Sequence, residues 1–276
     1  MGKKMNNLST RIFVALIGIP LIIALSLLGK IPFLIFVLAI GLISFFEFSK
    51  MVRSRHTYTT RLIGYTSVGL IIVNEYKNFV DYQIFFLIVT ALLLLTELFR
   101  NKESAIANLG ASLLGIMYIG FFAASIVNLR EFYNESAFTY SQGGYLILSI
   151  MATIWICDSA AYFIGTAYGI HKLMPRVSPN KSWEGAVAGF VFSVLGMIAA
   201  HELILEFMEM KDAVVIGVIV GAFGQVGDLI ESLIKRDAHV KDSSSIIPGH
   251  GGILDRFDSL LFTAPIVYLY LTFFTK

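Results

Sequence analysis

Three consecutive stretches near the C-terminal end decide how this sequence folds: GVIVGAFGQVGDLIESLI (217–234), KRDAHVKDSSSIIPGHGGILDRFD (235–258) and SLLFTAPIVYLYLTFF (259–274). The first and third belong to apolar runs long enough for α-helices that cross the ~30 Å hydrocarbon core of a bilayer. The middle stretch carries many charges, histidine and three glycines. A link that only reverses the chain does not need this chemistry, so function is expected there.

The composition extends the membrane assignment to the whole chain. Of 276 residues, 57% are hydrophobic and 14% are charged, and the mean hydropathy is +0.77. These values predict an all-α polytopic membrane protein with about nine transmembrane helices, forming a single integral membrane domain over 1–276. Residues 1–100 supply spans of low motif content, whereas 145–276 supply the spans and cytoplasmic links that carry the motifs. The predicted spans cover residues 12–29, 31–48, 61–76, 82–99, 105–127, 145–167, 186–205, 213–234 and 257–275.

The basic residues predict the orientation of the chain. Sixteen of the 21 Lys and Arg residues fall in the N-terminal tail and the even-numbered links. Because positive charge stays in the cytoplasm, the N-terminus and the long polar links are expected to be cytoplasmic. The first apolar run is too long for a signal peptide, so we expect it to be retained. The sixteen are Lys3, Lys4, Arg11, Lys50, Arg53, Arg55, Arg61, Arg100, Lys102, Lys172, Arg176, Lys181, Lys235, Arg236, Lys241 and Arg256, against Lys30, Lys77, Arg130, Lys211 and Lys276.

Ionisable side chains inside two predicted spans point to a site, because such groups are costly in a membrane. Asp158 lies in the sixth span, where pairing with a lysine or a tyrosine hydroxyl is the structural alternative. Asp228 lies in the eighth, where an interhelical contact or a charge reaching the membrane surface is the alternative. Steps of three and four place a polar stripe on one face of the eighth span. The stripe consists of Gln225, Asp228, Glu231, Ser232 and Lys235.

The segment HKLMPRVSPNKSWEGA (171–186) precedes the seventh span. Pro179 suits the first turn of a helix with Ser178 as its cap. Lys181 and Ser182 then become hydrogen-bond donors to a phosphate near a helix N-terminus. The plainer alternative is a capped helix start anchored at the interface by Trp183.

The glycine-rich run PGHGG (248–252) leads directly into the last span. Asp255 and Asp258 are three residues apart and lie near its first turn, where the helix dipole stabilises carboxylates. With Asp228 they offer the oxygen ligands that Mg²⁺ prefers. Lysines and arginines in the same stretch offer countercharge for a polyphosphate, although interfacial loops are often charged without a ligand. Together these features predict a phosphoryl or nucleotidyl transfer site.

The order of these residues resembles the signature of the phosphatidate cytidylyltransferase (CDP-diacylglycerol synthase) family. The matching string is SLIKR (232–236), four residues, KD (241–242), five residues, and PGHGGILDRFD (248–258). The segments from Asp158 to Gly169 and SPNKSWEG (178–185) also look like that family. The resemblance implies the reaction CTP + phosphatidic acid → CDP-diacylglycerol + pyrophosphate in phospholipid biosynthesis. It also implies a multi-pass enzyme of the plasma (inner) membrane, if bacterial, with a cytoplasmic catalytic face.

Residue roles follow from the resemblance as expectations. Asp228, Lys235, Asp255 and Asp258 are the expected catalytic residues, and the three aspartates hold Mg²⁺ with Asp158 in the outer shell. A second, monovalent cation and a homodimer are further implications. The expected partners are CTP, phosphatidic acid and the bilayer, with no nucleic acid. The expected substrate-binding residues are Lys181, Ser182, Ser232, Arg236, Lys241, Asp242, His250, Gly251, Gly252 and Arg256.

Two other functions compete with this interpretation. A secondary transporter would use Asp158 and Asp228 as intramembrane ion sites, and it predicts corresponding motifs in two halves of the sequence. No such pair of motifs is found in the sequence. Another lipid-phosphate enzyme, such as a CDP-alcohol phosphotransferase, would carry a closely spaced aspartate motif that begins Asp-Gly and contains Ala-Arg. This sequence lacks that motif.

Overall fold

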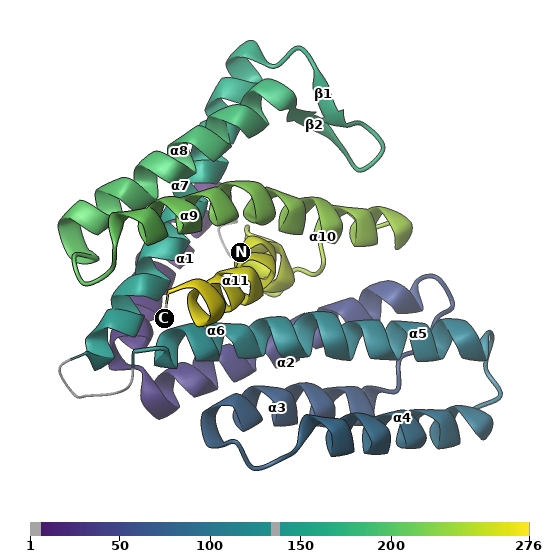
Figure 1. The fold of residues 1–276 in the computed structure, drawn as a ribbon. Helices are drawn as coiled ribbons and strands as arrows, with labels where there is room; N and C mark the ends of the chain where they lie inside the picture. Colours follow the sequence, from purple (N-terminus) through teal and green to yellow (C-terminus); the bar gives the residue numbers. More distant parts are fainter. Residues whose placement is uncertain (1–6, 134–138, 276) are drawn as a thin grey trace, which may run out of the picture. The chain divides into compact units, whose positions relative to one another are not determined.

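The computed structural model describes residues 7–133 and 139–275, which form nine continuous helices (Figure 1). Each of the nine predicted spans corresponds to one helix, so the all-α prediction is confirmed apart from one short hairpin. Lys3, Lys4 and Lys276, which entered the charge count, lie outside the described residues. The helices are α1 (Asn7–Leu28), α2 (Lys30–Arg53), α3 (Arg61–Lys77), α4 (Tyr82–Leu98), α5 (Ala105–Gly115) with η1 (Ile116–Phe121) and α6 (Phe122–Glu131), α7 (Tyr140–Tyr168), α8 (Trp183–Ile204), α9 (Met210–Ile219) with η2 (Val220–Gly224) and α10 (Gln225–Asp237), and α11 (Leu254–Phe274).

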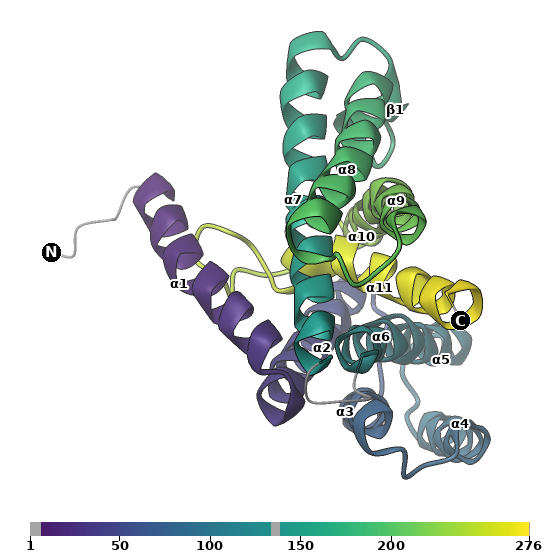
Figure 2. The same cartoon turned by 60° about the vertical axis from the view of Figure 1, so that its left-hand side comes forward.

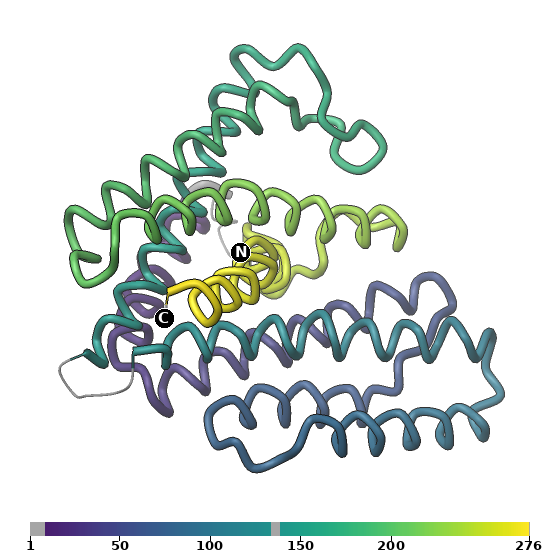
Figure 3. The backbone as a smooth tube through the Cα atoms, viewed as in Figure 1, coloured from purple at the N-terminus to yellow at the C-terminus, as the bar shows by residue number. Residues whose placement is uncertain are grey.

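Two of the nine helices contain a π-helical turn. The backbone tube passes without a break from α5 through η1 to α6, and from α9 through η2 to α10 (Figure 3). A π turn inserts an extra residue into an α-helix and changes which face the following residues occupy; such turns are frequent at functional sites. The turn η2 ends at Gly224, directly before the polar stripe that begins at Gln225.

Length and composition make seven of the described helices suitable for crossing a membrane. The chain is therefore a multi-pass membrane protein, as predicted. The other two, α3 and α4, have 17 residues each. At 1.5 Å per residue such a helix is about 26 Å long, which is at the lower limit for a span. The nine predicted spans thus correspond to nine helices among the described residues, of which seven are long and apolar enough to cross a membrane.

The chain divides into two compact units. The first comprises Met1–Leu25, Lys30–Val127 and Asp237–Phe257, and the second comprises Ser26–Gly29, Asn128–Arg236 and Asp258–Lys276. The single domain expected over 1–276 stays a prediction. Both units combine segments that are distant in sequence.

In the first unit, α2 packs against α3 and η1 through buried aromatic and aliphatic side chains. Asn108 of α5 joins the link before α3 to the end of α4: its Oδ1 accepts from the Tyr58 N–H at 2.6 Å, and its Nδ2 donates to Glu97 Oε1 at 2.7 Å. Arg100 forms an ion pair with Glu97 at 3.0 Å. Buried polar groups need such partners, so this network fixes the links between the helices.

In the second unit, α7 runs alongside α8, and α8 packs against α9 and η2 (Figure 2). At Gly227 the backbone of α10 lies directly against α11. A Cβ atom at that position would lie 2.7 Å from the Phe262 Cβ and 2.8 Å from the Asp258 carbonyl oxygen. Only glycine permits this backbone contact. The contact brings the polar residues of α10 close to Asp258, the first residue of α11 that belongs to the second unit.

The segment before α8 differs from the prediction. Residues Lys172–Met174 (β1) and Ser178–Ser182 (β2) form an antiparallel hairpin, and α8 begins only at Trp183. The predicted helix start at Pro179 with Ser178 as cap is therefore wrong. Proline also suits the edge of a sheet, where its missing N–H costs nothing. Ser182 is the actual cap, because its Oγ accepts from the Gly185 N–H at 3.2 Å.

Candidate functional site

Three carboxylates converge in the second unit. Asp228 and Glu231 lie on one face of α10, and Asp258 lies on α11; carboxylate oxygens of the three lie within 4.8 Å of one another. Glu231 is 0% exposed and Asp258 is 8% exposed. We call these residues the acidic trio. Carboxylates at this spacing, two of them buried, repel one another unless cations neutralise them, so the trio is a candidate metal-binding group.

Two lysines contact the acidic trio. Lys181 of β2 forms an ion pair with Asp228, and Lys235 forms an ion pair with Glu231 one turn earlier on α10. Ser232 Oγ donates to Asp228 Oδ1 at 3.3 Å. These contacts offset part of the cost of burying the carboxylates. They also place two ammonium groups where anionic phosphates would need countercharge.

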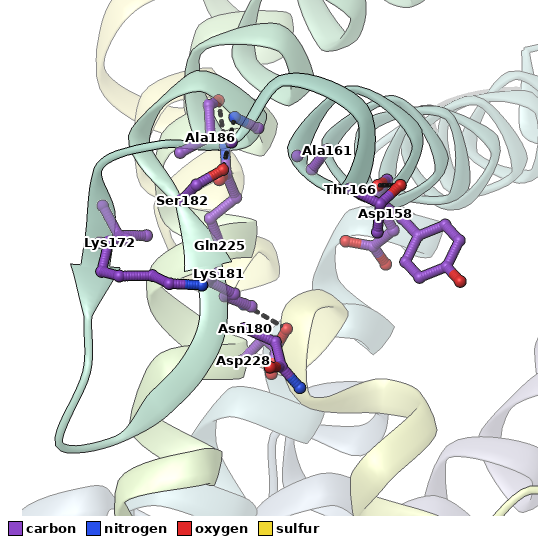
Figure 4. A pocket seen from close by; sticks show the side chains of 15 residues that line it. Asp158, Ala161, Thr166, Lys172, Asn180, Lys181, Ser182, Ala186, Gln225 and Asp228 are labelled. Atoms are coloured by element: carbon purple, nitrogen blue, oxygen red, sulfur yellow. Dashed lines mark hydrogen bonds and ion pairs between the residues drawn. The ribbon is translucent and has the colours of Figure 1, made fainter.

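A cavity of about 660 Å³ opens beside Asp228. Figure 4 shows Asp158 and Thr166 of α7 on one side of this cavity and Lys172 and Lys181 of the hairpin on the other. Its volume is within the range of small-molecule sites. Polar groups of three elements surround one space, as a site for a charged ligand requires. The other polar lining residues include Asn180, Ser182, Gln225 and Tyr162.

The glycine-rich loop belongs to the first unit and is organised by Asp255. The carboxylate accepts from the Ser243 N–H at 3.0 Å, from Ser243 Oγ at 2.9 Å and from the Gly252 N–H at 2.7 Å. Gly251 has a φ of +86°, a conformation that favours glycine. Asp255 therefore closes the loop around the start of α11.

A second cavity, of about 380 Å³, lies within the first unit along this loop. Arg256 Nε donates to the His250 carbonyl at 2.8 Å, and Arg11 Nε of α1 donates to the Gly249 carbonyl at 2.9 Å. Guanidinium groups and glycine backbone at one cavity suit a phosphate-bearing ligand. The lining also includes Lys241, Asp242, Ser244 and Gly251.

The predicted site residues thus divide between the two units. The structure brings Asp228 and Asp258 together, and the metal roles predicted for these two residues and for Asp255 stay predictions. Arg236 Nε donates to the Val177 carbonyl in the hairpin turn at 3.2 Å. The second unit holds Asp158, Lys181, Ser182, Asp228, Ser232, Lys235, Arg236 and Asp258, and the first holds Lys241, Asp242, His250, Gly251, Gly252, Asp255 and Arg256.

Sequence reasoning gave no site role to two buried glutamates. Glu231 lay on the predicted polar stripe, and its spacing of three from Asp228 was the signal that could have found it. Glu47 of α2 gave no comparable signal, because its partners lie about 200 residues later in the sequence. For Arg11 the sequence pattern predicts only a cytoplasmic position.

Comparison with known proteins places this chain in a class. The profile of the cytidylyltransferase family matches residues 9–274, so the chain belongs to the cytidylyltransferase family. The chain is 33% identical over 275 residues to the phosphatidate cytidylyltransferase of Brucella suis biovar 1 (strain 1330), covering 99% of this chain and 96% of that protein. It is 32% identical over 278 residues to the phosphatidate cytidylyltransferase of Bacillus subtilis (strain 168), covering 98% and 100%. For that of Staphylococcus aureus (strain COL), the identity is 33% over 270 residues, covering 96% and 99%.

These matches confirm the family that the signature predicted, and they extend the matched region towards the N-terminus. The resemblance rested on residues 158–258, whereas the matched region begins at residue 9. The N-terminal helices therefore belong to the family's fold, even though they lack its recognisable motif. The prediction of a nucleotidyltransferase enzyme is also confirmed.

Proposed function

We propose that this chain transfers the cytidylyl group of CTP to phosphatidic acid, releasing pyrophosphate and forming CDP-diacylglycerol. The observation that carries the proposal is the acidic trio with its two lysines beside a polar cavity of about 660 Å³. Full-length similarity to proteins named phosphatidate cytidylyltransferase supports it. A membrane-embedded enzyme suits a lipid substrate that resides in the bilayer.

The reaction forms one phosphorus–oxygen bond and breaks another. An oxygen of the lipid phosphate attacks the α-phosphorus of CTP. The bond from that phosphorus to the oxygen bridging to the β-phosphate breaks, and pyrophosphate leaves with the electron pair. Because the lipid phosphate is already ionised near neutral pH, no strong general base is required. Catalysis then depends on positioning and on neutralising charge.

The acidic trio fits a divalent metal ion. Asp228, Glu231 and Asp258 offer only oxygen ligands, as Mg²⁺ prefers, and two of them come from one helix face. When bound, Mg²⁺ neutralises phosphate charge and polarises the reacting phosphoryl group. We assign the metal to these three residues. An outer-shell role for Asp158 and a second, monovalent cation are additional predictions.

The cations divide into two groups. Lys181 and Lys235 already contact the acidic trio and would neutralise phosphates that bind beside it. In the first unit, Lys241 and Arg256 line the cavity together with His250 and the glycine backbone; this lining fits a polyphosphate, and we assign the cavity to CTP. The remaining predicted substrate residues shape or support these two groups of basic side chains. They are Asp242, Gly251, Gly252, Ser182, Ser232 and Arg236.

The catalytic face is proposed to be cytoplasmic. Sixteen of 21 basic residues lie on one predicted side of the membrane, and the links that carry the motifs are on that side. CTP is also a cytoplasmic metabolite. If the protein is bacterial, the proposed location is the plasma (inner) membrane. The homodimer stays a prediction.

Labelled substrates test the reaction. Purified protein in detergent receives phosphatidic acid and CTP labelled at either the α- or the γ-phosphorus. We expect α-label in a lipid product and γ-label in pyrophosphate. A CDP-alcohol phosphotransferase would use neither substrate but would release CMP from CDP-diacylglycerol. A transporter would leave both labels in CTP. Either of these results would contradict the proposed function.

A further inference from the structure

Glu47 is a buried carboxylate in the last third of the apolar helix α2. It lies on α2 among Phe45, Phe48 and other hydrophobic side chains, and it is 0% exposed. Burying a carboxylate costs several kcal/mol unless hydrogen bonds replace its water. The partners that replace water here all come from residues 241–254, which we call the signature loop and which include the start of α11, within the same unit.

Four donors converge on this carboxylate. Oε1 accepts from Ser244 Oγ at 2.5 Å and from the Ile253 N–H at 3.0 Å. Oε2 accepts from Ser243 Oγ at 3.1 Å and from the Leu254 N–H at 2.7 Å. An ionised carboxylate only accepts hydrogen bonds, so its chemistry matches four donors. The geometry joins both ends of the loop to one side chain.

Two of these donors are backbone groups at the beginning of α11. The first N–H groups of a helix have no partner within the helix, and a negative charge there is favourable. Helices are usually capped by a residue that is adjacent in sequence. Here Glu47, more than 200 residues away, supplies the negative charge. The start of α11 is thereby held against α2.

Gly252 makes this arrangement possible. A Cβ atom at position 252 would lie 2.5 Å from Glu47 Oε1 and 2.0 Å from Ser243 Oγ. Ser243 in turn bonds both Glu47 and Asp255. The two carboxylates therefore share one serine, and the glycine between them must lack a side chain. Glu47 and Asp255 thus hold the loop through Ser243. Lys241 and His250 of the loop, with Arg256 of α11, line the first unit's cavity.

We propose that Glu47 is a positioning residue for the signature loop, residues 241–254. By fixing both ends of the loop it sets the cationic lining of the first unit's cavity for the CTP phosphates. This inference rests on the proposed function of that cavity. It gives the N-terminal helices a part in substrate binding that their own sequence does not reveal.

Glu47→Gln tests the proposal with little change of shape. The amide replaces one accepting oxygen by an N–H₂ group that faces donors, so at least two of the four bonds are lost. Glu97→Gln is the matched control. Glu97 is also a buried carboxylate of the first unit, but its partners Asn108 and Arg100 lie outside the loop. Both variants are expected to lower thermal stability, and only the first should disturb the loop.

Loop order is measured without substrate. A nitroxide spin label is attached to a cysteine at the exposed Ser245, in a Cys157→Ala background, and its mobility is followed by electron paramagnetic resonance. We expect greater mobility with Glu47→Gln and a spectrum equal to the parent's with Glu97→Gln. Equal spectra for the parent and Glu47→Gln would overturn the positioning role.

Steady-state kinetics without the label then connect loop order to function. We expect Glu47→Gln to raise the KM for CTP by roughly tenfold, the effect of losing about one charge-assisted hydrogen bond, while the KM for phosphatidic acid changes less than about twofold. Glu97→Gln should change neither KM. If Glu47→Gln lowers kcat alone, or matches Glu97→Gln, the proposal is wrong. A parent chain that does not consume CTP would instead contradict the proposed function, so the two failures are distinguishable.

Discussion

The ammonium group of Lys181 on β2 is paired with the carboxylate of Asp228 on α10. This contact joins the hairpin before α8 to the helix that carries the acidic trio, and it spans 47 residues of sequence. The cavity of about 660 Å³ is lined by both side chains. A lysine held on a candidate metal ligand is placed to neutralise a phosphate that binds there.

The first prediction concerns this lysine. Lys181→Gln should lower kcat/KM for CTP or phosphatidic acid by about 10 to 100-fold, corresponding to about 1.5 to 3 kcal/mol for a charge-assisted hydrogen bond. Initial rates with each substrate varied separately will show which of them it serves. Lys211→Gln is the control, because Lys211 is exposed and pairs only with the exposed Glu209 among the described residues. Equal kinetics for the two variants would remove Lys181 from the site.

The second prediction concerns the acidic trio. Glu231→Gln should weaken metal binding, because a neutral amide cannot balance the charge of a divalent ion. Titration of the purified protein with Mn²⁺, followed by electron paramagnetic resonance of free Mn²⁺, measures this without turnover. We expect an affinity at least about tenfold lower, and the same for Asp228→Asn and Asp258→Asn. Parent-like affinity in all three variants would contradict the metal assignment.

Asp255→Asn distinguishes two roles for Asp255: ordering the signature loop and binding the metal. Its carboxylate accepts three hydrogen bonds from the loop. We therefore expect a higher KM for CTP with little change in Mn²⁺ affinity. A loss of Mn²⁺ affinity as large as that of Asp228→Asn would support the metal role that the sequence pattern predicted.

The third prediction concerns Arg130, which is 0% exposed and donates to three carbonyls. The partners are Ser26 at 2.5 Å, Tyr140 at 3.0 Å and Leu27 at 3.1 Å. Two of these carbonyls end α1 and lack helical partners. Arg130→Met should cost about 2 to 4 kcal/mol and lower the Tm in detergent by roughly 5 to 15 °C. The exposed Arg61→Met is the control, and a similar Tm shift for both would contradict this role.

Much of the fold could be predicted because the bilayer imposes one length and one polarity on each span. All nine predicted spans became helices, although α3 and α4 are only marginally long. The hairpin was missed because Pro179 suits both a helix start and an edge strand. Which serine caps the helix depends on tertiary packing. Local sequence patterns therefore predicted the helix α8 but not the residue at which it begins.

The candidate site was predictable to the extent that its residues share one helix. Spacing placed Asp228, Glu231, Ser232 and Lys235 on one polar face, and the family resemblance then gave site roles to all of them except Glu231. Glu47 could not be recognised, because its role is defined by donors about 200 residues away. A glutamate in an apolar run indicates only that some partner exists. Which partner it has is decided by packing between helices.

The fourth prediction concerns sidedness and follows from the distribution of basic residues. Single cysteines at the exposed Ser245 and Glu206, in a Cys157→Ala background, should react with an impermeant maleimide from opposite sides of sealed vesicles. Ser245 is expected to be cytoplasmic. Labelling of both from the same side would require a different number of spans and would refute the proposed orientation.

The most direct test of the central claim is the rate of CDP-diacylglycerol formation by the purified parent chain with and without metal. Protein in detergent receives phosphatidic acid and α-labelled CTP with Mg²⁺, with EDTA, or with EDTA followed by excess Mg²⁺. We expect labelled CDP-diacylglycerol and an equal amount of pyrophosphate with Mg²⁺, almost none with EDTA, and recovery when Mg²⁺ is restored. Undiminished formation in EDTA would contradict the metal site, and no labelled lipid under any condition would contradict cytidylyl transfer itself.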